Sequence, residues 1–138
     1  MYPECVSDDS VLEQEFGERF NKFALLKART SIKELSGGLT NRNFLIETPG
    51  DKYVARVSSN SSSFLAIDRG SEFINTTIAG KGGVVAQVLD YIPGEGLLLI
   101  SYISGKTFGA KDVGANLPRI ATSLRNLHAL KPFDHEFN

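Results

Sequence analysis

A glycine pair between two predicted strands is the first segment that could do chemistry. Residues 35–41 read Leu-Ser-Gly-Gly-Leu-Thr-Asn, so the pair is Gly37 and Gly38. Glycines let a backbone approach a ligand closely, and successive free N–H groups in such a turn can bind phosphate oxygens. A Gly-Gly pair between strands is also typical of an ordinary turn. Both interpretations stay open on this segment alone.

A cation in an apolar strand is the second candidate. In residues 53–57, Tyr-Val-Ala-Arg-Val, strand alternation places Arg56 on the face opposite Ala55 and Val57. A cation there is costly to bury unless it meets an anion, and a guanidinium group offers planar, bidentate donors for phosphate or carboxylate. The alternative is a solvent-facing arginine on an outer sheet face.

A carboxylate on the next predicted helix completes the set. Glu72 lies off the apolar stripe of that helix, so periodicity alone predicts that it is solvated or paired with Arg69 one turn earlier. However, a glycine hairpin, a strand cation and a helix carboxylate in this order form the kinase type of nucleotide site. In that site the glycines cover the phosphates, and the acid holds the cation that pairs with them.

The elements that would position these groups follow from the hydrophobic periodicity. An amphipathic helix is predicted over residues 10–28, with a core stripe of Leu12, Phe16, Phe20 and Phe23. A second helix is predicted over 67–79, with Ile67, Ile74 and Ile78 on one face. A third begins at 116–118, with Ile120, Leu124 and Leu127 as its buried face.

Five short strands are predicted between these helices, over residues 31–35, 43–47, 52–57, 84–91 and 97–103. A Pro-Gly-Asp turn at 49–51 indicates a hairpin, and the first three strands are expected to form an antiparallel meander. The expected fold class is α+β, a mainly antiparallel five-stranded sheet with helices packed on it.

Composition excludes several classes of function. The chain of 138 residues has a net charge of −1 and no basic block, which argues against a nucleic-acid partner. Its one cysteine, Cys5, allows neither an internal disulfide nor a thiolate metal cluster. No secretory signal is visible, and the longest apolar stretch, 97–100, is far too short to span a membrane. A reducing cytoplasm is the expected location.

These strings resemble the N-terminal lobe of choline and ethanolamine kinases, within the aminoglycoside-phosphotransferase and protein-kinase-like group. The resemblance rests on Gly-Gly-Leu-Thr-Asn at 37–41, Tyr-Val-Ala-Arg-Val at 53–57, and Ile-Asp-Arg at 67–69 followed by Glu72. It covers about residues 32–130. Protein kinases use lysine at the strand position, whereas this branch resembles the present sequence in having arginine there.

The resemblance implies that the chain binds ATP, with Thr40 and Asn41 joining the glycines over the phosphates. It implies that Ser101, Tyr102 and Ile103 form the hinge whose backbone meets the adenine. The implied division is a helical segment over 1–30, a nucleotide-binding lobe over 31–104, and a connector with the first helix of a second lobe over 105–138. Mg²⁺ ligands are implied in the rest of that second lobe, so none is assigned here.

The resemblance also implies a catalytic loop, His-x-Asp-x-x-x-x-Asn, that the chain lacks, so no catalytic residue is assigned. Leu130 stands two residues after His128, and Phe137 two after His135. Gly105-Lys106-Thr107 resembles the end of a P-loop, but Ile100 occupies the position of its first glycine. We therefore expect an inactive part of a longer kinase that phosphorylates choline or ethanolamine.

Two alternatives to this function stay open at this stage. In the first alternative the phosphate acceptor is an aminoglycoside, thiamine or a sugar. This sequence does not discriminate between acceptors, because acceptor contacts are expected in the second lobe. In the second alternative the chain is a non-catalytic nucleotide-binding or interaction module built on the same scaffold, which fold similarity alone never excludes. An exposed apolar lobe interface would also allow self-association.

Overall fold

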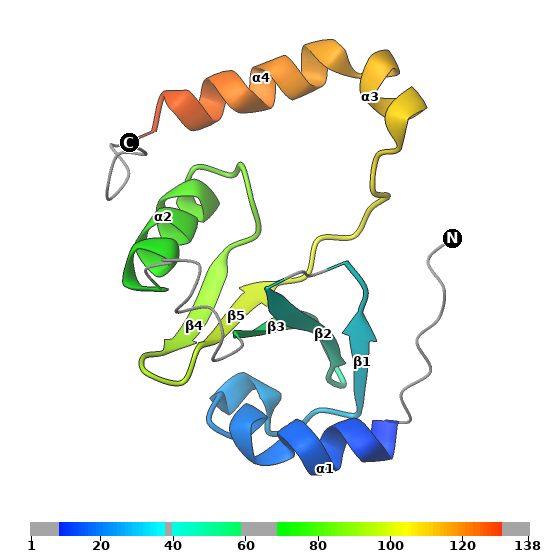
Figure 1. The fold of residues 1–138 in the computed structure, drawn as a ribbon, viewed down its shortest axis with the longest axis vertical. Helices are drawn as coiled ribbons and strands as arrows, with labels where there is room; N and C mark the ends of the chain where they lie inside the picture. The colour runs from blue at the N-terminus through cyan, green and yellow to red at the C-terminus, as the bar shows by residue number, and fades with distance from the viewer. Residues whose placement is uncertain (1–8, 38–39, 59–68, 131–138) are drawn as a thin grey trace.

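A five-stranded antiparallel sheet forms the centre of the computed structural model, which describes residues 9–37, 40–58 and 69–130 (Figure 1). The strands are β1 (Ser31–Leu35), β2 (Asn41–Glu47), β3 (Lys52–Ser58), β4 (Val88–Ile92) and β5 (Leu97–Ser101). Their order across the sheet is β1-β2-β3-β5-β4, and every neighbouring pair is antiparallel. The predicted α+β class and the antiparallel meander of the first three strands are confirmed.

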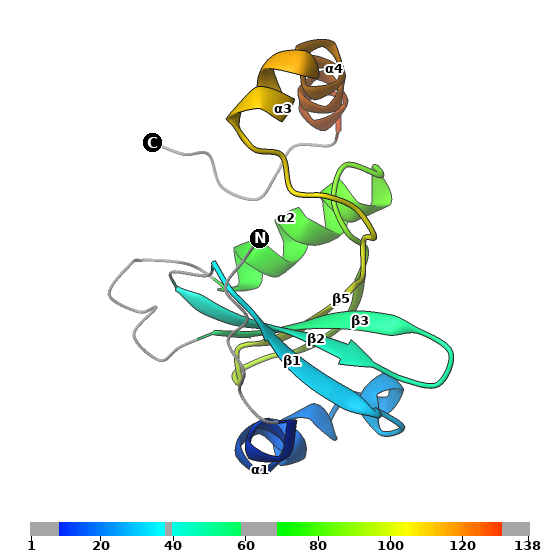
Figure 2. The same ribbon diagram turned by 90° about the vertical axis from the view of Figure 1, so that its right-hand side faces the viewer.

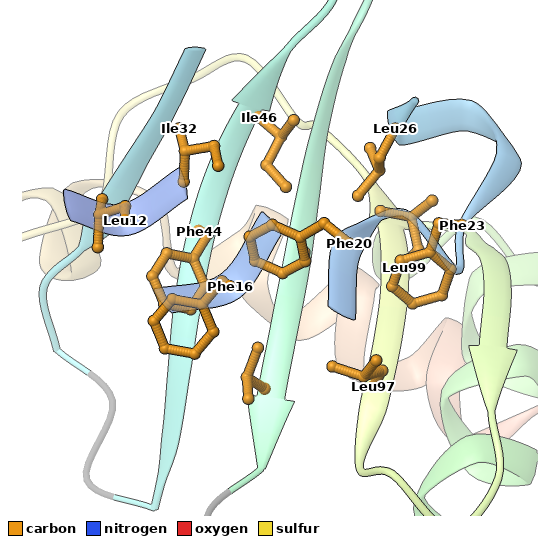
Figure 3. Close-up of a cluster of buried hydrophobic side chains, with 12 residues drawn as sticks. Leu12, Phe16, Phe20, Phe23, Leu26, Ile32, Phe44, Ile46, Leu97 and Leu99 are labelled. Carbon is orange, nitrogen blue, oxygen red and sulfur yellow. The ribbon is translucent and has the colours of Figure 1, made fainter. Parts of the chain in front are cut away.

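The hydrophobic core lies between the sheet and the N-terminal helices, on the face of the sheet that is called the outer face below. Strand alternation places Phe44 and Ile46 of β2, and Leu97 and Leu99 of β5, on this face (Figure 3). Helix α1 (Asp9–Phe20) and the short 3₁₀ helix η1 (Ala24–Leu26) cover them. Figure 2 shows α1 on one side of the sheet and helix α2 (Arg69–Lys81) on the other. The fully buried residues contributed by this N-terminal segment are Leu12, Phe20, Phe23 and Leu26.

Arg29 connects helix α1 to the 3₁₀ helix η1 through hydrogen bonds to both. Its side chain is only 7% exposed, and its Nε donates to Glu13 Oε2 at 2.9 Å. Its Nη1 donates to the carbonyl of Leu26 at 2.9 Å, and its Nη2 to the carbonyl of Gly17 at 3.1 Å. A Cβ on Gly17 would lie 3.3 Å from Nη2 and closer still to Glu13, so the glycine gives the guanidinium room against α1.

Helix α2 (Arg69–Lys81) lies on the inner face of the sheet, against β4. Phe73 of α2 stacks on Tyr91 of β4 with ring centroids 4.5 Å apart and an interplanar angle of 11°. The predicted apolar stripe of this helix is wrong at Ile74, which is 43% exposed. Ile67 lies outside the described residues. The helix packs instead through Phe73 and through the small buried residues Ser71, Ala79 and Gly80.

Several predicted boundaries differ from the structure. The helix predicted over 10–28 ends at Phe20, because Phe23 adopts an extended backbone and reaches the core from outside α1. The strand predicted over 84–91 starts only at Val88, and the one predicted over 97–103 ends at Ser101. The strand predicted to begin at 43 begins two residues earlier, at Asn41.

Beyond β5 the chain forms two helices, α3 (Ala110–Ala115) and α4 (Leu117–His128), of which α3 was not predicted. The predicted buried face of α4 is wrong, because Leu124 is 50% exposed and no residue of α4 is buried. The far end of α4 returns to α2 (Figure 1). There the Leu130 side chain occupies the space that a Cβ on Gly82 would fill, with a separation of 2.5 Å. No helix within the described ranges is long and apolar enough to cross a membrane.

Candidate functional site

An ion pair joins the strand cation to the helix carboxylate. The Nη1 atom of Arg56 lies 2.8 Å from Oε1 of Glu72, and both side chains are less than one-third exposed. Ala55 and Val57 point into the outer core, so alternation along β3 turns Arg56 to the inner face, where α2 packs. The two residues, which are 16 positions apart in the sequence, therefore meet on the inner face of the sheet, the pairing that the order of the three motifs suggested and that periodicity alone did not.

Glu72 is shared with a second arginine. Nη1 of Arg69 lies 2.5 Å from Oε2 of Glu72, one turn earlier on α2. Two cations around one carboxylate leave one net positive charge. The remaining nitrogens of Arg69, Nε and Nη2, are buried and have no hydrogen-bond partner in the part of the chain described. Buried donors without an acceptor are costly, so this corner of the structure favours an anionic ligand.

Asn43 connects the glycine hairpin to this cluster, a contact that sequence reasoning missed. Asn43 stands directly opposite Arg56 in the β2–β3 register, and its Oδ1 accepts a hydrogen bond from Arg56 Nε at 3.3 Å. Counting back from the hairpin at 48–51 would have paired the two residues. Arg56 is thus held from two elements, by Asn43 on the neighbouring strand and by Glu72 on the helix.

The hairpin that joins β1 to β2 stands beside this cluster. Gly37 has a φ of 109°, a backbone conformation that glycine adopts without strain. Thr40 is half-buried, and Oδ1 of Asn41 is buried without a hydrogen-bond partner in the described ranges. Gly38 lies outside the described residues. Asn41 pairs in register with Ser58, which places the β2 side of the hairpin at the same end of β3 as Arg56.

A small pocket lies at this end of the sheet, between the inner face and α2. Ser58, Gly96 and Leu98 form its sheet side, and Gly96 approaches the sheet so closely that a Cβ would lie 2.9 Å from Cβ of Ser58. The complete lining is Arg56, Ser58, Arg69, Glu72, Phe73, Tyr91, Gly96 and Leu98. The charged cluster therefore borders on an apolar floor, and the cavity of about 10 Å³ between them has room for about one water molecule.

The predicted hinge residues lie at the other end of the same strands. Ser101 is opposite Tyr53, three residues along β3 from Arg56, which is about 10 Å at roughly 3.3 Å per residue. The amide of Ser101 donates to the carbonyl of Gln87 at 2.9 Å, so it is already used. Tyr102 and Ile103 are exposed, and their backbone groups make no hydrogen bond to any described residue.

Two apolar residues between hinge and cluster were also missed. Val54 lies two positions before Arg56, on the same inner face, and Ile100 is its partner on β5. They form a flat surface between the exposed hinge and Arg56. The signal for Val54 in the sequence is strand alternation, because a residue two positions before Arg56 lies on the same face of the sheet.

The described residues offer no independent metal centre. No group of three or more His, Cys, Asp or Glu side chains lies close enough within them to hold a metal ion. Glu72, the carboxylate of the cluster, is engaged by two arginines. Two arginines around one carboxylate suit an anionic ligand, and this arrangement does not by itself suit Mg²⁺.

Several solved structures share the fold of this chain. A choline/ethanolamine kinase family protein from Mesorhizobium loti is 26% identical, with a TM-score of 0.74 over 92% of this chain and 42% of its own. Choline kinase LicA from Streptococcus pneumoniae is 20% identical, with a TM-score of 0.71 over 94% of this chain and 43% of its own. LicA has also been solved in complex with AMP.

The chain thus spans less than half the length of these structures, and it corresponds to their kinase-like N-terminal lobe. Among curated proteins no sequence matches it. The sequence profile of the phosphotransferase enzyme family matches residues 31–137, which include the whole sheet, the Arg56–Glu72 cluster and the hinge. The chain belongs to the phosphotransferase enzyme family.

Proposed function

We propose that the chain is the nucleotide-binding N-terminal lobe of an ATP-dependent kinase that phosphorylates a hydroxyl of choline or ethanolamine. The observation that carries the proposal is the Arg56–Glu72 ion pair beside the β2 side of the glycine hairpin, next to two buried nitrogens of Arg69 that have no hydrogen-bond partner among the described residues. Three segments that are distant in the sequence meet there around one net positive charge.

The phosphates would lie between the hairpin and Arg56. The hairpin residues proposed to cover the phosphates are Gly37, Thr40 and Asn41, together with Gly38, which lies outside the described residues. A guanidinium group binds phosphate oxygens through two parallel N–H bonds, and Glu72 and Asn43 hold that group in a fixed orientation. Positioning and charge neutralisation are the main requirements of phosphoryl transfer, because there is little covalent chemistry for the protein to perform.

The adenine would lie at the opposite end of the inner face. Tyr102 and Ile103 offer backbone donors and acceptors that no described residue uses. Val54 and Ile100 would contact the flat face of the base. The separation of about 10 Å along β3 between hinge and cation suits a nucleotide that lies along the strand.

The remaining chemistry would come from outside residues 1–138. Mg²⁺ and the catalytic loop would be supplied by a second lobe, of which residues 105–138 are the connector and first helix. The implied division at residues 30 and 104 is part of this proposal, as is a cytoplasmic location. Choline or ethanolamine is proposed as acceptor because the neighbours that share the fold are named as kinases of these alcohols.

The nucleotide site is tested by Arg56→Ala, with affinities for ATP, ADP and adenosine measured by calorimetry. Loss of a charge-assisted, bidentate contact of about 2–3 kcal/mol is expected to weaken ATP and ADP binding about 30- to 150-fold and to leave adenosine binding unchanged. Arg125→Ala, an exposed arginine on α4, is the matched control. Unchanged ATP affinity in a folded Arg56→Ala chain would refute the site.

The activity is tested by reading the gene beyond codon 138. A downstream His-x-Asp-x-x-x-x-Asn loop is expected, and the longer product should transfer phosphate from ATP to choline or ethanolamine. Transfer only to an aminoglycoside, thiamine or a sugar would reassign the acceptor. A reading frame that ends at residue 138 would favour a non-catalytic module.

A further inference from the structure

Arg42 occupies the outer face of the sheet at the base of the glycine hairpin, where it joins three elements. Its Nε and Nη2 atoms each lie 2.8 Å from one carboxylate oxygen of Glu34 on β1, a bidentate pair. Its Nη1 lies 2.8 Å from Oε1 of Glu15 on α1. A single guanidinium group therefore ties both strands of the hairpin to each other and to the N-terminal helix.

Two aromatic rings lie against this guanidinium group. Its carbon lies 4.6 Å from the ring centroid of Phe16 on α1 and 5.3 Å from that of Phe44 on β2. The two rings themselves are in contact, with centroids 4.6 Å apart. Single exposed ion pairs contribute little, but a bidentate pair whose guanidinium group also lies against two buried rings is restrained by several contacts at once.

Arg42 and Asn43 are consecutive, so their side chains leave β2 on opposite faces. On the outer face Arg42 contacts Glu15 of α1, and on the inner face Asn43 contacts Arg56. The β2 backbone at the foot of the hairpin is therefore fixed from both sides. One side is the N-terminal helix, and the other is the cation of the candidate phosphate site.

We propose that Arg42 is a positioning residue that uses α1 as a rigid support for the phosphate-binding hairpin. The inference rests on the proposed nucleotide site and assigns α1 a role in it. Preorganisation of a loop lowers the entropy lost when the loop orders around a ligand. Removing the support should therefore loosen the hairpin and weaken nucleotide binding while leaving the sheet folded.

The experiment compares backbone ¹⁵N order parameters without ligand, and ATP affinity, in the wild-type chain and in Arg42→Leu. The order parameters of Gly37, Thr40 and Asn41 are expected to fall from the rigid value of about 0.85 towards about 0.6. The ATP dissociation constant is expected to rise about tenfold. Arg42→Lys, which keeps the charge without the fork, should recover only part of both.

Two further variants make the result decisive. Glu15→Ala removes the α1 carboxylate alone and should loosen the hairpin in the same direction, so it also decides the matter if Arg42→Leu does not fold. Lys52→Met breaks an ion pair with Glu47 at the opposite end of β2 and should leave the hairpin unchanged. A merely structural Arg42 would lower thermal stability without changing the hairpin order parameters.

Unchanged order parameters in a folded Arg42→Leu chain would overturn the inference, and so would a loosened hairpin with unchanged ATP affinity. If the hairpin loosens but the wild-type chain binds no ATP at all, the nucleotide site is wrong and the support by α1 stands. The two proposals therefore fail in different ways.

Discussion

Arg69 and Glu72 are joined by a 2.5 Å contact between Nη1 and Oε2, one helical turn apart on α2, so the carboxylate that holds Arg56 is itself held by a second cation. Sequence reasoning treated Arg69 as a rival partner that would make Glu72 an ordinary surface residue. The structure places both arginines on the same carboxylate, one on each oxygen. Glu72 can thus orient Arg56 from a fixed position of its own.

Removing Arg69 should weaken nucleotide binding. Arg69→Met keeps much of the apolar stem but leaves Glu72 with one cation and removes the two unpartnered donors. A charge-assisted hydrogen bond contributes about 1.5–3 kcal/mol, so we expect the ATP dissociation constant to rise about 10- to 100-fold. Calorimetry measures this, with Arg125→Met on α4 as control. Equal affinities for the variant and the wild-type chain would show that Arg69 has no part in the site.

Removing Arg29 should lower stability. Its side chain is 93% buried and bonds to Glu13, Asn21 and two backbone carbonyls in the N-terminal segment. Arg29→Met leaves the carbonyls of Gly17 and Leu26 without this donor, and we expect a loss of about 2–4 kcal/mol in the free energy of unfolding. Urea denaturation measures it. Lys22→Met, which removes an exposed ion pair with Glu95, should cost less than about 1 kcal/mol.

Alanine should destabilise the protein more at Gly96 than at Gly94, because the backbone at Gly96 lies close to Ser58. Both have positive φ, 64° and 79°, so alanine at either costs about 1–2 kcal/mol. A Cβ at Gly96 would also lie 2.9 Å from Cβ of Ser58, whereas nothing lies within 4 Å at Gly94. Gly96→Ala should therefore be less stable than Gly94→Ala by about a further 1–3 kcal/mol of crowding. Similar unfolding midpoints for the two variants would contradict this reading of the pocket wall.

The stability of the chain should fall in acid partly through Glu13 and Glu34. Hydrogen bonds from Arg29 and Arg42, respectively, hold the pKa of each carboxyl below its ordinary value of 4.5, although burial opposes the shift. A pKa lowered by folding contributes stability above 4.5, and that stability is lost as the pH falls through the folded-state value. Urea denaturation from about pH 6 to about pH 3 should show this loss.

The matched variant for this pH effect is Glu13→Gln combined with Glu34→Gln. Because it lacks both carboxyls, its unfolding free energy should decline less steeply below about pH 4.5. Parallel declines in the variant and the wild-type chain would assign the acid sensitivity to other groups.

The sequence predicted the sheet well because its signals are local. Strand alternation and the Pro-Gly-Asp turn placed β1, β2 and β3 to within two residues. The same alternation turned Arg56 away from Ala55 and Val57, and the order of motifs paired it with Glu72. The roles of these residues, of the hinge and of the hairpin remain predictions.

The errors came where burial depends on distant contacts. Ile74 and Leu124 have helical spacing typical of core residues, yet both are exposed, because α2 packs through Phe73 and small residues and α4 touches the rest of the protein near its end. Asn43 was missed because its importance arises from the β2–β3 register. The Arg42 contacts were missed because they need the position of α1 on the sheet.

The meeting of Leu130 with Gly82 has a consequence for the segment after β5. That segment leaves the sheet at Ser101, and its Leu130 side chain contacts Gly82 at the end of α2. The segment is therefore held to the rest of the protein at both ends. Glycine at position 82 leaves room for the Leu130 side chain, because a Cβ there would lie 2.5 Å from Cδ2 of Leu130. A larger residue at position 82 would require the Leu130 side chain to turn aside, and the contact that joins this segment to the end of α2 would change.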